Sequence, residues 1–155
     1  MRHHCRGFTL LELMVVIVLI GVLLGMVSFA TGPNPARLAR HEADSVAQII
    51  QQLRERAVLE GQAYGLRLSA GGYQPMKLEG RDWEPLAALH RWSENLRPRL
   101  ELDGYFVTLG GDDGPPQLMM LDSDETSAFT LTFSSANKTW FSVSSDGIGG
   151  VVIDG

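Results

Sequence analysis

Residues 6–12 read Arg6-Gly7-Phe8-Thr9-Leu10-Leu11-Glu12, and an apolar run continues from them to Ala30. A helix of about 23 residues with a rise of 1.5 Å per residue is long enough to cross a hydrocarbon layer about 30 Å thick. The sequence therefore predicts a transmembrane helix over residues 8–30. Glu12 is the only charged residue in this segment. A carboxylate there costs about 2 to 3 kcal/mol on insertion scales, which indicates a functional role and a positively charged partner.

A chain amine would be a suitable partner for Glu12. Cleavage after Gly7 would give Phe8 a free ammonium group within one helical turn of the carboxylate. If Glu12 reaches the Phe8 amine of a neighbouring, axially shifted helix, both charges are neutralised and the stagger between subunits is fixed. Gly21 and Gly25 form a small-xxx-small pair that allows another helix to pack closely. We therefore expect Glu12, Gly21 and Gly25 to be the assembly residues.

The flanks of the span predict its orientation. Arg2 and Arg6 precede it, so the N-terminus is expected in the cytoplasm and the C-terminal remainder on the other side. Two alternatives remain open. A conventional secretory signal could end at Ser28-Phe29-Ala30, although its apolar core is normally shorter and lacks a carboxylate. A plain single-span anchor explains the length of the segment but leaves Glu12 without a role.

Composition indicates one small acidic domain beyond the span. The chain has 155 residues and a formal charge of −5, and without residues 1–7 it has 11 basic against 18 acidic residues. Such a charge argues against nucleic-acid binding. The only cysteine, Cys5, precedes the expected cleavage site, as do His3 and His4. The mature chain is therefore expected to form no disulfide, and we predict no cofactor and no metal at these residues.

A hinge is expected at residues 31–35, because Gly32-Pro33-Asn34-Pro35 interrupts a regular helix. From Ala36 an apolar stripe with spacings of three and four predicts a second helix, which ends at Gly61. The stripe consists of Ala39, Ala43, Val46, Ile50, Leu53 and Ala57. The charged residues of this helix, including Glu42 and Arg54, are assigned mostly to its other faces. Coiled-coil pairing is the rival interpretation of the stripe.

Beyond Gly61 the pattern alternates, which predicts antiparallel β structure. Residues 64–68 and 73–78 are expected to form a hairpin, with Pro75 marking the second strand as an edge or irregular strand. A short helical turn is expected at residues 85–90. Further strands are predicted at residues 100–102, 105–109, 117–121, 129–133, 140–143 and 151–153. Residues 36–155 are therefore expected to form one α+β domain in which the helix packs on antiparallel sheets.

The N-terminal motif resembles the class III signal of type IV pilins and type II secretion pseudopilins. In that superfamily a prepilin peptidase cuts after the glycine and methylates the new N-terminal phenylalanine. The resemblance therefore implies a leader of residues 1–7, cleavage after Gly7 and N-methylation of Phe8. It also implies a role for Glu12 in subunit recruitment, and a pilin-like fold in which the first half of a long helix is transmembrane.

The domain resembles general secretion pathway protein H, a minor pseudopilin family of type II secretion. The similar residues lie at 61–68, 116–118, 123–133, 140 and 146–149. The chain departs from the family's pattern at one position, where Asp124 precedes Glu125 and the family usually has glycine. The resemblance implies a non-enzymatic assembly subunit of the periplasmic pseudopilus, which drives export of folded proteins across the outer membrane. Its expected partners are the other minor and major pseudopilins, the prepilin peptidase and the inner-membrane assembly platform.

Two other functions compete with this one. A minor pilin of a type IV pilus, acting in pilus assembly or DNA uptake, is the main alternative, but the acidic C-terminal third and the missing disulfide argue against it. Calcium binding by Asp112-Asp113 or by Asp122, Asp124 and Glu125 also remains open. Their spacing matches no EF-hand loop, and exposed acidic loops are usually just solvated.

Overall fold

The computed structural model describes residues 9–29, 34–136 and 138–155, with only the backbone of residues 24–29. The chain divides into two compact units, residues 1–34 and residues 35–155. Unit 1 contains a single described helix, α1 (Leu10–Phe29). This agrees with the expected helix except at its two ends. The expected hinge, residues 31–35, falls largely outside the described residues, and only its last two positions are described.

Unit 2 begins with helix α2 (Pro35–Glu60), as the apolar stripe predicts. All six stripe residues are buried, each with at most 3% of its surface exposed. Proline suits the first position of a helix because no intrahelical partner is lost there. At the other end Gly61 takes a φ of +61°, and the amide of Gln62 donates to the carbonyl oxygen of Ala57 at 3.2 Å. This left-handed glycine cap ends α2 as expected.

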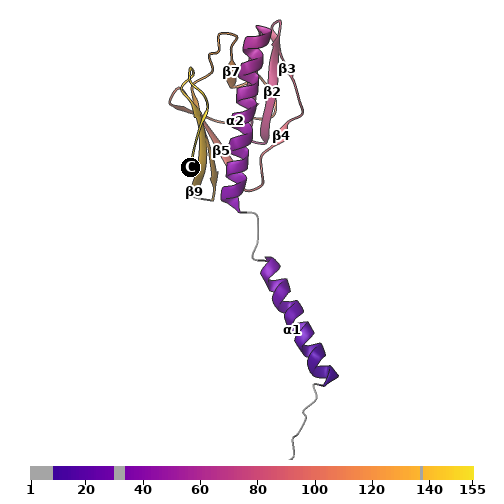
Figure 1. The fold of residues 1–155 in the computed structure, drawn as a ribbon. Coiled ribbons are helices and arrows are strands. Elements are labelled where there is room, and N and C mark those ends of the chain that lie inside the picture. Colours follow the sequence, from indigo (N-terminus) through magenta and orange to yellow (C-terminus); the bar gives the residue numbers. More distant parts are fainter. Residues whose placement is uncertain (1–8, 30–33, 137) are drawn as a thin grey trace, which may run out of the picture. The chain divides into compact units, whose positions relative to one another are not determined.

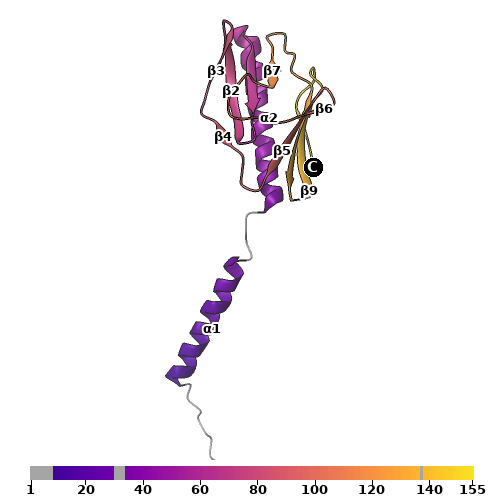
Figure 2. The same cartoon turned by 180° about the vertical axis from the view of Figure 1, so that it is seen from behind.

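Within residues 34–136 and 138–155, ten strands follow α2 and form two antiparallel sheets. They are β1 (Tyr64–Leu68), β2 (Gly72–Glu79), β3 (Asp82–Pro85), β4 (His90–Arg91), β5 (Arg97–Leu102), β6 (Tyr105–Val107), β7 (Leu118–Met120), β8 (Phe129–Ser135), β9 (Lys138–Ser145) and β10 (Val152–Asp154). The first sheet has the order β3-β2-β1-β7, and β4 also pairs with β2. The second sheet has the order β10-β9-β8-β5-β6. Figures 1 and 2 show α2 running along both sheets.

The core lies where the stripe of α2 meets the inner faces of the two sheets. It includes Tyr64, Leu66 and Leu68 of the first sheet, and Leu131 and Phe133 of the second. On β8 the buried residues alternate with half-buried ones, as expected for a sheet with one face on a core. The predicted α+β fold, a helix packed on antiparallel sheets, is therefore confirmed.

The prediction that β2 is an edge or irregular strand because of Pro75 was wrong. β2 is an inner strand, with β1 on one side and both β3 and β4 on the other. The carbonyl oxygen of Pro75 accepts a bond from the amide of Leu86 at 2.9 Å, so the missing N–H of Pro75 also faces that side. There it meets the break between the end of β3 and the start of β4. The interruption in the neighbouring strands allows proline in this position.

The short helical turn expected at residues 85–90 was also wrong. β3 ends at Pro85, β4 begins at His90, and the residues between them form a bend. β3 returns directly from β2 through Gly80, whose φ is +64°. Pairing with β2 on both sides of the bend holds the segment extended, and this tertiary constraint overrides its weak local helical tendency.

Candidate functional site

Helix α1 begins immediately after Thr9, which caps it. The Thr9 hydroxyl accepts a hydrogen bond from the amide of Glu12 at 3.3 Å, and the Thr9 carbonyl oxygen accepts one from the amide of Leu13 at 3.2 Å. Thr9 and Glu12 thus have the spacing of a capping box, and Glu12 is the third helical residue. A carboxylate is favoured there by the partial positive charge of the helix start. Gly7 and Phe8, the predicted processing residues, lie outside the described residues.

The predicted assembly residues lie on one helix but not on one face. Glu12 and Gly21 are nine residues apart, which places them about half a turn from each other around the axis at 100° per residue. Gly25 follows Gly21 by one turn and shares its side of the helix. A Cβ added at Gly21 would meet no atom within 4 Å. The carboxylate and the glycine pair therefore lie on different sides of the helix.

Apart from Glu12, the described side chains of α1, residues 10–23, are exposed and mostly apolar around the helix. The large apolar residues from Leu10 to Leu23 have exposed fractions between 42% and 77%. In the described parts of the chain, no helix combines the length and the apolarity that crossing a membrane requires. The expected span, residues 8–30, begins and ends outside the described residues, and it stays a prediction.

A buried arginine connects α2 to two loops of the domain. Arg54 is 7% exposed, and its guanidinium lies 3.0 Å from the Asp124 carboxylate. It also donates to the carbonyl oxygens of Gly149 at 2.8 Å, Asp124 at 3.2 Å and Ile148 at 3.4 Å. The prediction that the charged residues of α2 lie mostly away from the core is therefore wrong for Arg54. Its fixed fork of donors holds both loops against the helix.

The two loops held by Arg54 are also closed by their own hydrogen bonds. The Asp146 carboxylate accepts bonds from the amides of Gly149 at 2.7 Å and Ile148 at 3.0 Å. These bonds hold the pKa of the Asp146 carboxyl below its ordinary value of 3.8. Asp124 has a φ of +69°, a conformation that glycine adopts without strain. At the position where the resembled family usually has glycine, this chain thus gains a carboxylate for Arg54 and keeps the left-handed turn.

A second buried charge, Glu42, connects the other half of α2 to the crossover between the sheets. Glu42 is 2% exposed and accepts bonds from the amide of Ser93 at 2.9 Å and from its hydroxyl at 2.6 Å. Its other oxygen lies 3.5 Å from Nε2 of His90. Burial, followed by the nearby Glu42 charge, raises the pKa of Tyr73 to about 12. Tyr73 packs against the rings of His90 and Trp92, so these aromatic side chains form a cluster next to the residues that contact Glu42.

The sequence interpretation missed Glu42 and Arg54, although a signal was present. Glu42 lies three residues after Ala39, and Arg54 lies four residues after Ile50. These spacings place both residues at the border of the apolar stripe, where a long charged side chain can be covered by neighbouring elements.

The acidic loops do not assemble a metal centre in the described structure. Among the residues it describes, no group of three or more His, Cys, Asp or Glu side chains is placed to hold a metal ion. Asp112 accepts a bond from the Ser69 hydroxyl at 2.5 Å, and Asp124 pairs with Arg54. Each acidic cluster therefore has a carboxylate with a partner within the chain.

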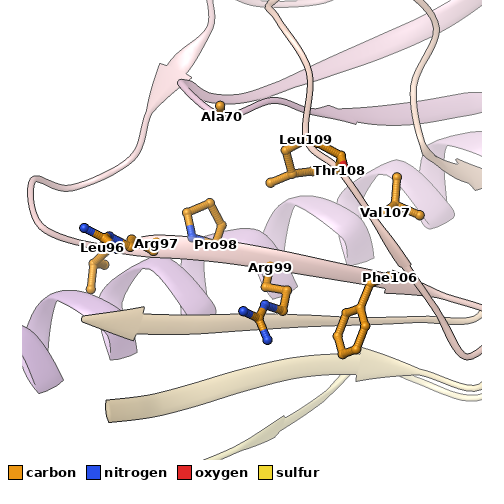
Figure 3. A pocket seen from close by; sticks show the side chains of 9 residues that line it. All are labelled: Ala70, Leu96, Arg97, Pro98, Arg99, Phe106, Val107, Thr108 and Leu109. Carbon is orange, nitrogen blue, oxygen red and sulfur yellow. The ribbon is translucent and has the colours of Figure 1, made fainter. Parts of the chain in front are cut away.

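A groove of about 670 Å³ lies beside β5 and the segment that follows β6 (Figure 3). Its lining is mostly apolar, with two arginines of β5, Arg97 and Arg99. A second hollow of about 520 Å³ lies at the C-terminal half of α2, next to Arg54 and Asp124.

Comparison with known protein families identifies both parts of the chain. The prokaryotic N-terminal methylation motif matches residues 2–28, and the type II transport protein GspH family matches residues 42–147. The second match covers the α2 helix from Glu42 onward and nearly all of the two sheets.

Individual relatives agree with the family match. Type II secretion system protein H of Pseudomonas aeruginosa is 38% identical over 157 aligned residues, which cover 92% of this chain and 91% of that protein. The protein of the same name from Aeromonas hydrophila is 26% identical and covers 88% of this chain and 85% of its own length.

A solved structure shows the same fold. The minor pseudopilin EpsH from the type 2 secretion system of Vibrio cholerae aligns with a TM-score of 0.65 at 24% identity. The alignment covers 75% of this chain and 94% of that chain. The chain therefore belongs to the type II transport protein GspH family, and it is a minor pseudopilin of type II secretion rather than a minor pilin of a type IV pilus.

Proposed function

We propose that residues 8–30 anchor this pseudopilin once in the bacterial inner membrane, with the N-terminus in the cytoplasm and residues 36–155 in the periplasm. Residues 31–35 would form the hinge between anchor and domain. The proposal is supported by the match to the methylation motif and by the exposed apolar side chains of α1. A helix that is apolar on all sides requires apolar surroundings. Arg2 and Arg6 support the orientation.

The prepilin peptidase is proposed to remove residues 1–7 by cutting after Gly7 and to methylate the amine of Phe8. This processing follows from the N-terminal methylation motif, which matches residues 2–28. It creates the positive charge that Glu12 requires, because the new amine lies four residues before the carboxylate.

The observation that carries the assembly proposal is the position of Glu12. It is the only charge between Phe8 and Ala30, and the Thr9 cap fixes it as the third residue of α1. A carboxylate so close to the start of the helix lies near the level of the chain amine. It can therefore contact the Phe8 amine of a neighbouring subunit after only a small axial shift between the two helices. Gly21 and Gly25, about half a turn away, would let a different helix pack closely. Two separate contacts per helix suit a subunit inside a staggered filament.

The domain is proposed to act without catalysis, cofactor or nucleic acid. Its buried charged side chains, Glu42 and Arg54, are occupied in holding loops and the crossover to α2. The formal charge of −5 opposes binding to phosphate backbones. The expected partners are the other pseudopilins, major and minor, together with the inner-membrane assembly platform. Assembly of these subunits would push folded proteins across the outer membrane.

The test replaces Glu12 by alanine in the full-length protein. Ile17→Ala, at another exposed position of α1, is the control. We expect both variants to stay in the membrane fraction, because removing a carboxylate favours insertion. Chemical cross-linking to other pseudopilins should be lost in Glu12→Ala and retained in Ile17→Ala. Cross-linking of Glu12→Ala at the wild-type level would show that the carboxylate is not the assembly contact.

A further inference from the structure

Within the described ranges of the chain, no strand pairs with the edge of β5 that borders the groove over Arg97–Arg99. β5 pairs with β8 over all six residues, Arg97–Leu102, but with β6 only over Leu100–Leu102. Beyond Val107 the chain leaves β5 and reaches the β1–β2 turn, where the amide of Ala70 donates to the carbonyl oxygen of Gly110 at 3.0 Å. The groove of about 670 Å³ lies between this departing segment and the first half of β5 (Figure 3).

Pro98 makes this edge unsuitable for adding another strand. The carbonyl oxygen of Arg97 accepts a bond from the Ser134 hydroxyl of β8, and the amide of Asp103 donates to Ala128 beside the start of β8. The odd-numbered residues of β5 thus direct their backbone groups toward β8, and Pro98 lies on the groove side without an N–H. Proline at an exposed edge opposes strand pairing. An occupant of the groove must therefore be held mainly by side-chain contacts.

The groove combines an apolar floor with unpaired positive charge. Leu96, Pro98, Val107 and Leu109 supply apolar lining, and Arg97 and Arg99 are exposed along β5. In the part of the chain that the structure describes, neither arginine forms an ion pair.

An exposed aromatic ring of β6 continues this surface. Phe106, which lines the groove, is 69% exposed. The Arg99 guanidinium lies 5.3 Å from the centre of the Phe106 ring, and Figure 3 shows the two side chains next to each other on one side of β5. Arginine and aromatic residues are the types enriched in protein interfaces and in their hot spots. The surface therefore has the composition of a protein-binding site.

We propose that this groove binds an acidic, extended segment of another subunit of the secretion filament, with an apolar side chain in the groove and a carboxylate on Arg97 or Arg99. Charge complementarity carries the choice, because Arg97 and Arg99 are exposed on β5, line the groove and attract carboxylates. A second copy of this chain is a poorer occupant. Of the acidic residues in its loops, Asp124 is engaged with Arg54, Asp146 with backbone amides and Asp112 with the Ser69 hydroxyl.

The inference rests on the proposed function, since the partner is sought among the filament subunits. The test introduces the photo-cross-linking residue p-benzoylphenylalanine in place of Thr108, a residue of the groove lining, in the full-length protein in cells that carry the secretion system. The same probe in place of Arg81, an exposed residue of the β2–β3 turn, is the control. Mass spectrometry of the cross-linked peptides identifies the partner and the segment.

We expect the cross-link from position 108 to map to an acidic segment of another filament subunit. Its yield should fall about tenfold in Arg97→Glu/Arg99→Glu, and it should be unchanged in the matched reversal Arg37→Glu/Arg81→Glu. Arg97→Lys/Arg99→Lys keeps the charge and should retain most of the yield. Replacing the mapped carboxylate by lysine should restore the cross-link to the glutamate variant.

Other results would overturn the inference. They are a cross-link to a second copy, a cross-link to a segment without carboxylates, no cross-link above the position 81 control, or a yield that does not respond to the charge reversal. Tryptophan fluorescence of each purified variant shows whether its domain is folded. If the domain of Arg97→Glu/Arg99→Glu is unfolded, the cross-link yield of Arg97→Lys/Arg99→Lys still tests whether positive charge is sufficient. Failure of the proposed function is distinguishable, because protein export would then be unchanged when the gene is deleted.

Discussion

Replacing Arg54 by methionine should destabilise the domain far more than removing its acidic partner. The guanidinium donates to three backbone carbonyl oxygens as well as to Asp124, and it is 7% exposed. Methionine keeps the apolar contacts of the side-chain stem but supplies no donor. The carbonyl oxygens of two loops would then lack their partner.

The magnitude follows from the geometry of these contacts. A hydrogen bond from a charged donor contributes about 1.5 to 3 kcal/mol, and the bonds to Gly149 and Asp124 have good lengths. The methionine variant no longer buries a charged guanidinium, and the desolvation free energy that it avoids offsets part of the loss. We therefore expect Arg54→Met to lower the free energy of unfolding by about 2 to 4 kcal/mol. For a domain of this size that corresponds to a melting temperature lower by roughly 10 °C.

Asp124→Gly should change the free energy of unfolding by less than about 1 kcal/mol. The Asp124 side chain is 59% exposed, so its ion pair with Arg54 is weak. Glycine also relieves the φ of +69° at this position. Arg40→Met is the control on the same helix, because Arg40 pairs with Asp44 at an exposed site, and we expect a loss below about 1 kcal/mol.

The assay is urea unfolding of the full-length protein in detergent, followed by tryptophan fluorescence. All three tryptophans, Trp83, Trp92 and Trp140, lie in unit 2, so the signal reports the domain alone. Equal losses for Arg54→Met and Asp124→Gly would refute the reasoning, because they would locate the stabilisation in the ion pair. A loss for Arg54→Met no larger than that for Arg40→Met would refute it as well.

Three further predictions concern Asp146, Gly72 and Gly7. The lowered pKa of Asp146 means that its stabilisation is complete above pH 3.8 and is lost as the pH falls through the lowered pKa, so wild type and Asp146→Asn should differ in urea midpoint at neutral pH and converge in acid. Equal separation at all pH values would contradict this. Gly72→Ala should cost more than about 2 kcal/mol, because its Cβ would lie 2.0 Å from the carbonyl oxygen of His90, whereas Gly110→Ala has open space and should cost far less; similar urea midpoints for the two variants would disprove the clash. Gly7→Ala should leave the leader attached, and a mature mass in the spectrum of the purified variant would show that the peptidase does not require this glycine.

The sequence predicts the helical half of the fold well because its signals are local. The α2 stripe repeats at three and four residues, and Gly61 ends the helix in a left-handed cap, so both ends and the buried face follow from short-range rules. The hairpin of β1 and β2 is predicted for the same reason, since two alternating segments flank a turn rich in glycine. The strands of the second sheet are predicted in place but are too short at several ends.

The wrong predictions depended on contacts between distant segments. Pro75 is tolerated inside a sheet only because the neighbouring strands are interrupted beside it, and that interruption lies ten and more residues further along the chain. Glu42 and Arg54 were assigned to exposed faces because their partners, Ser93 and Asp124, are 51 and 70 residues away. Charged residues at the border of an apolar stripe cannot be assigned from spacing alone when a loop covers them.

A minor pseudopilin of type II secretion should be needed for export of folded proteins, and the protein content of the culture medium tests this requirement. Mass spectrometry would compare the extracellular proteome of the source strain with that of a strain lacking the gene and with the complemented strain. In the deletion strain, folded exoproteins should disappear from the medium and accumulate in the periplasm, and they should return to the medium on complementation. An unchanged medium in the deletion strain would contradict it.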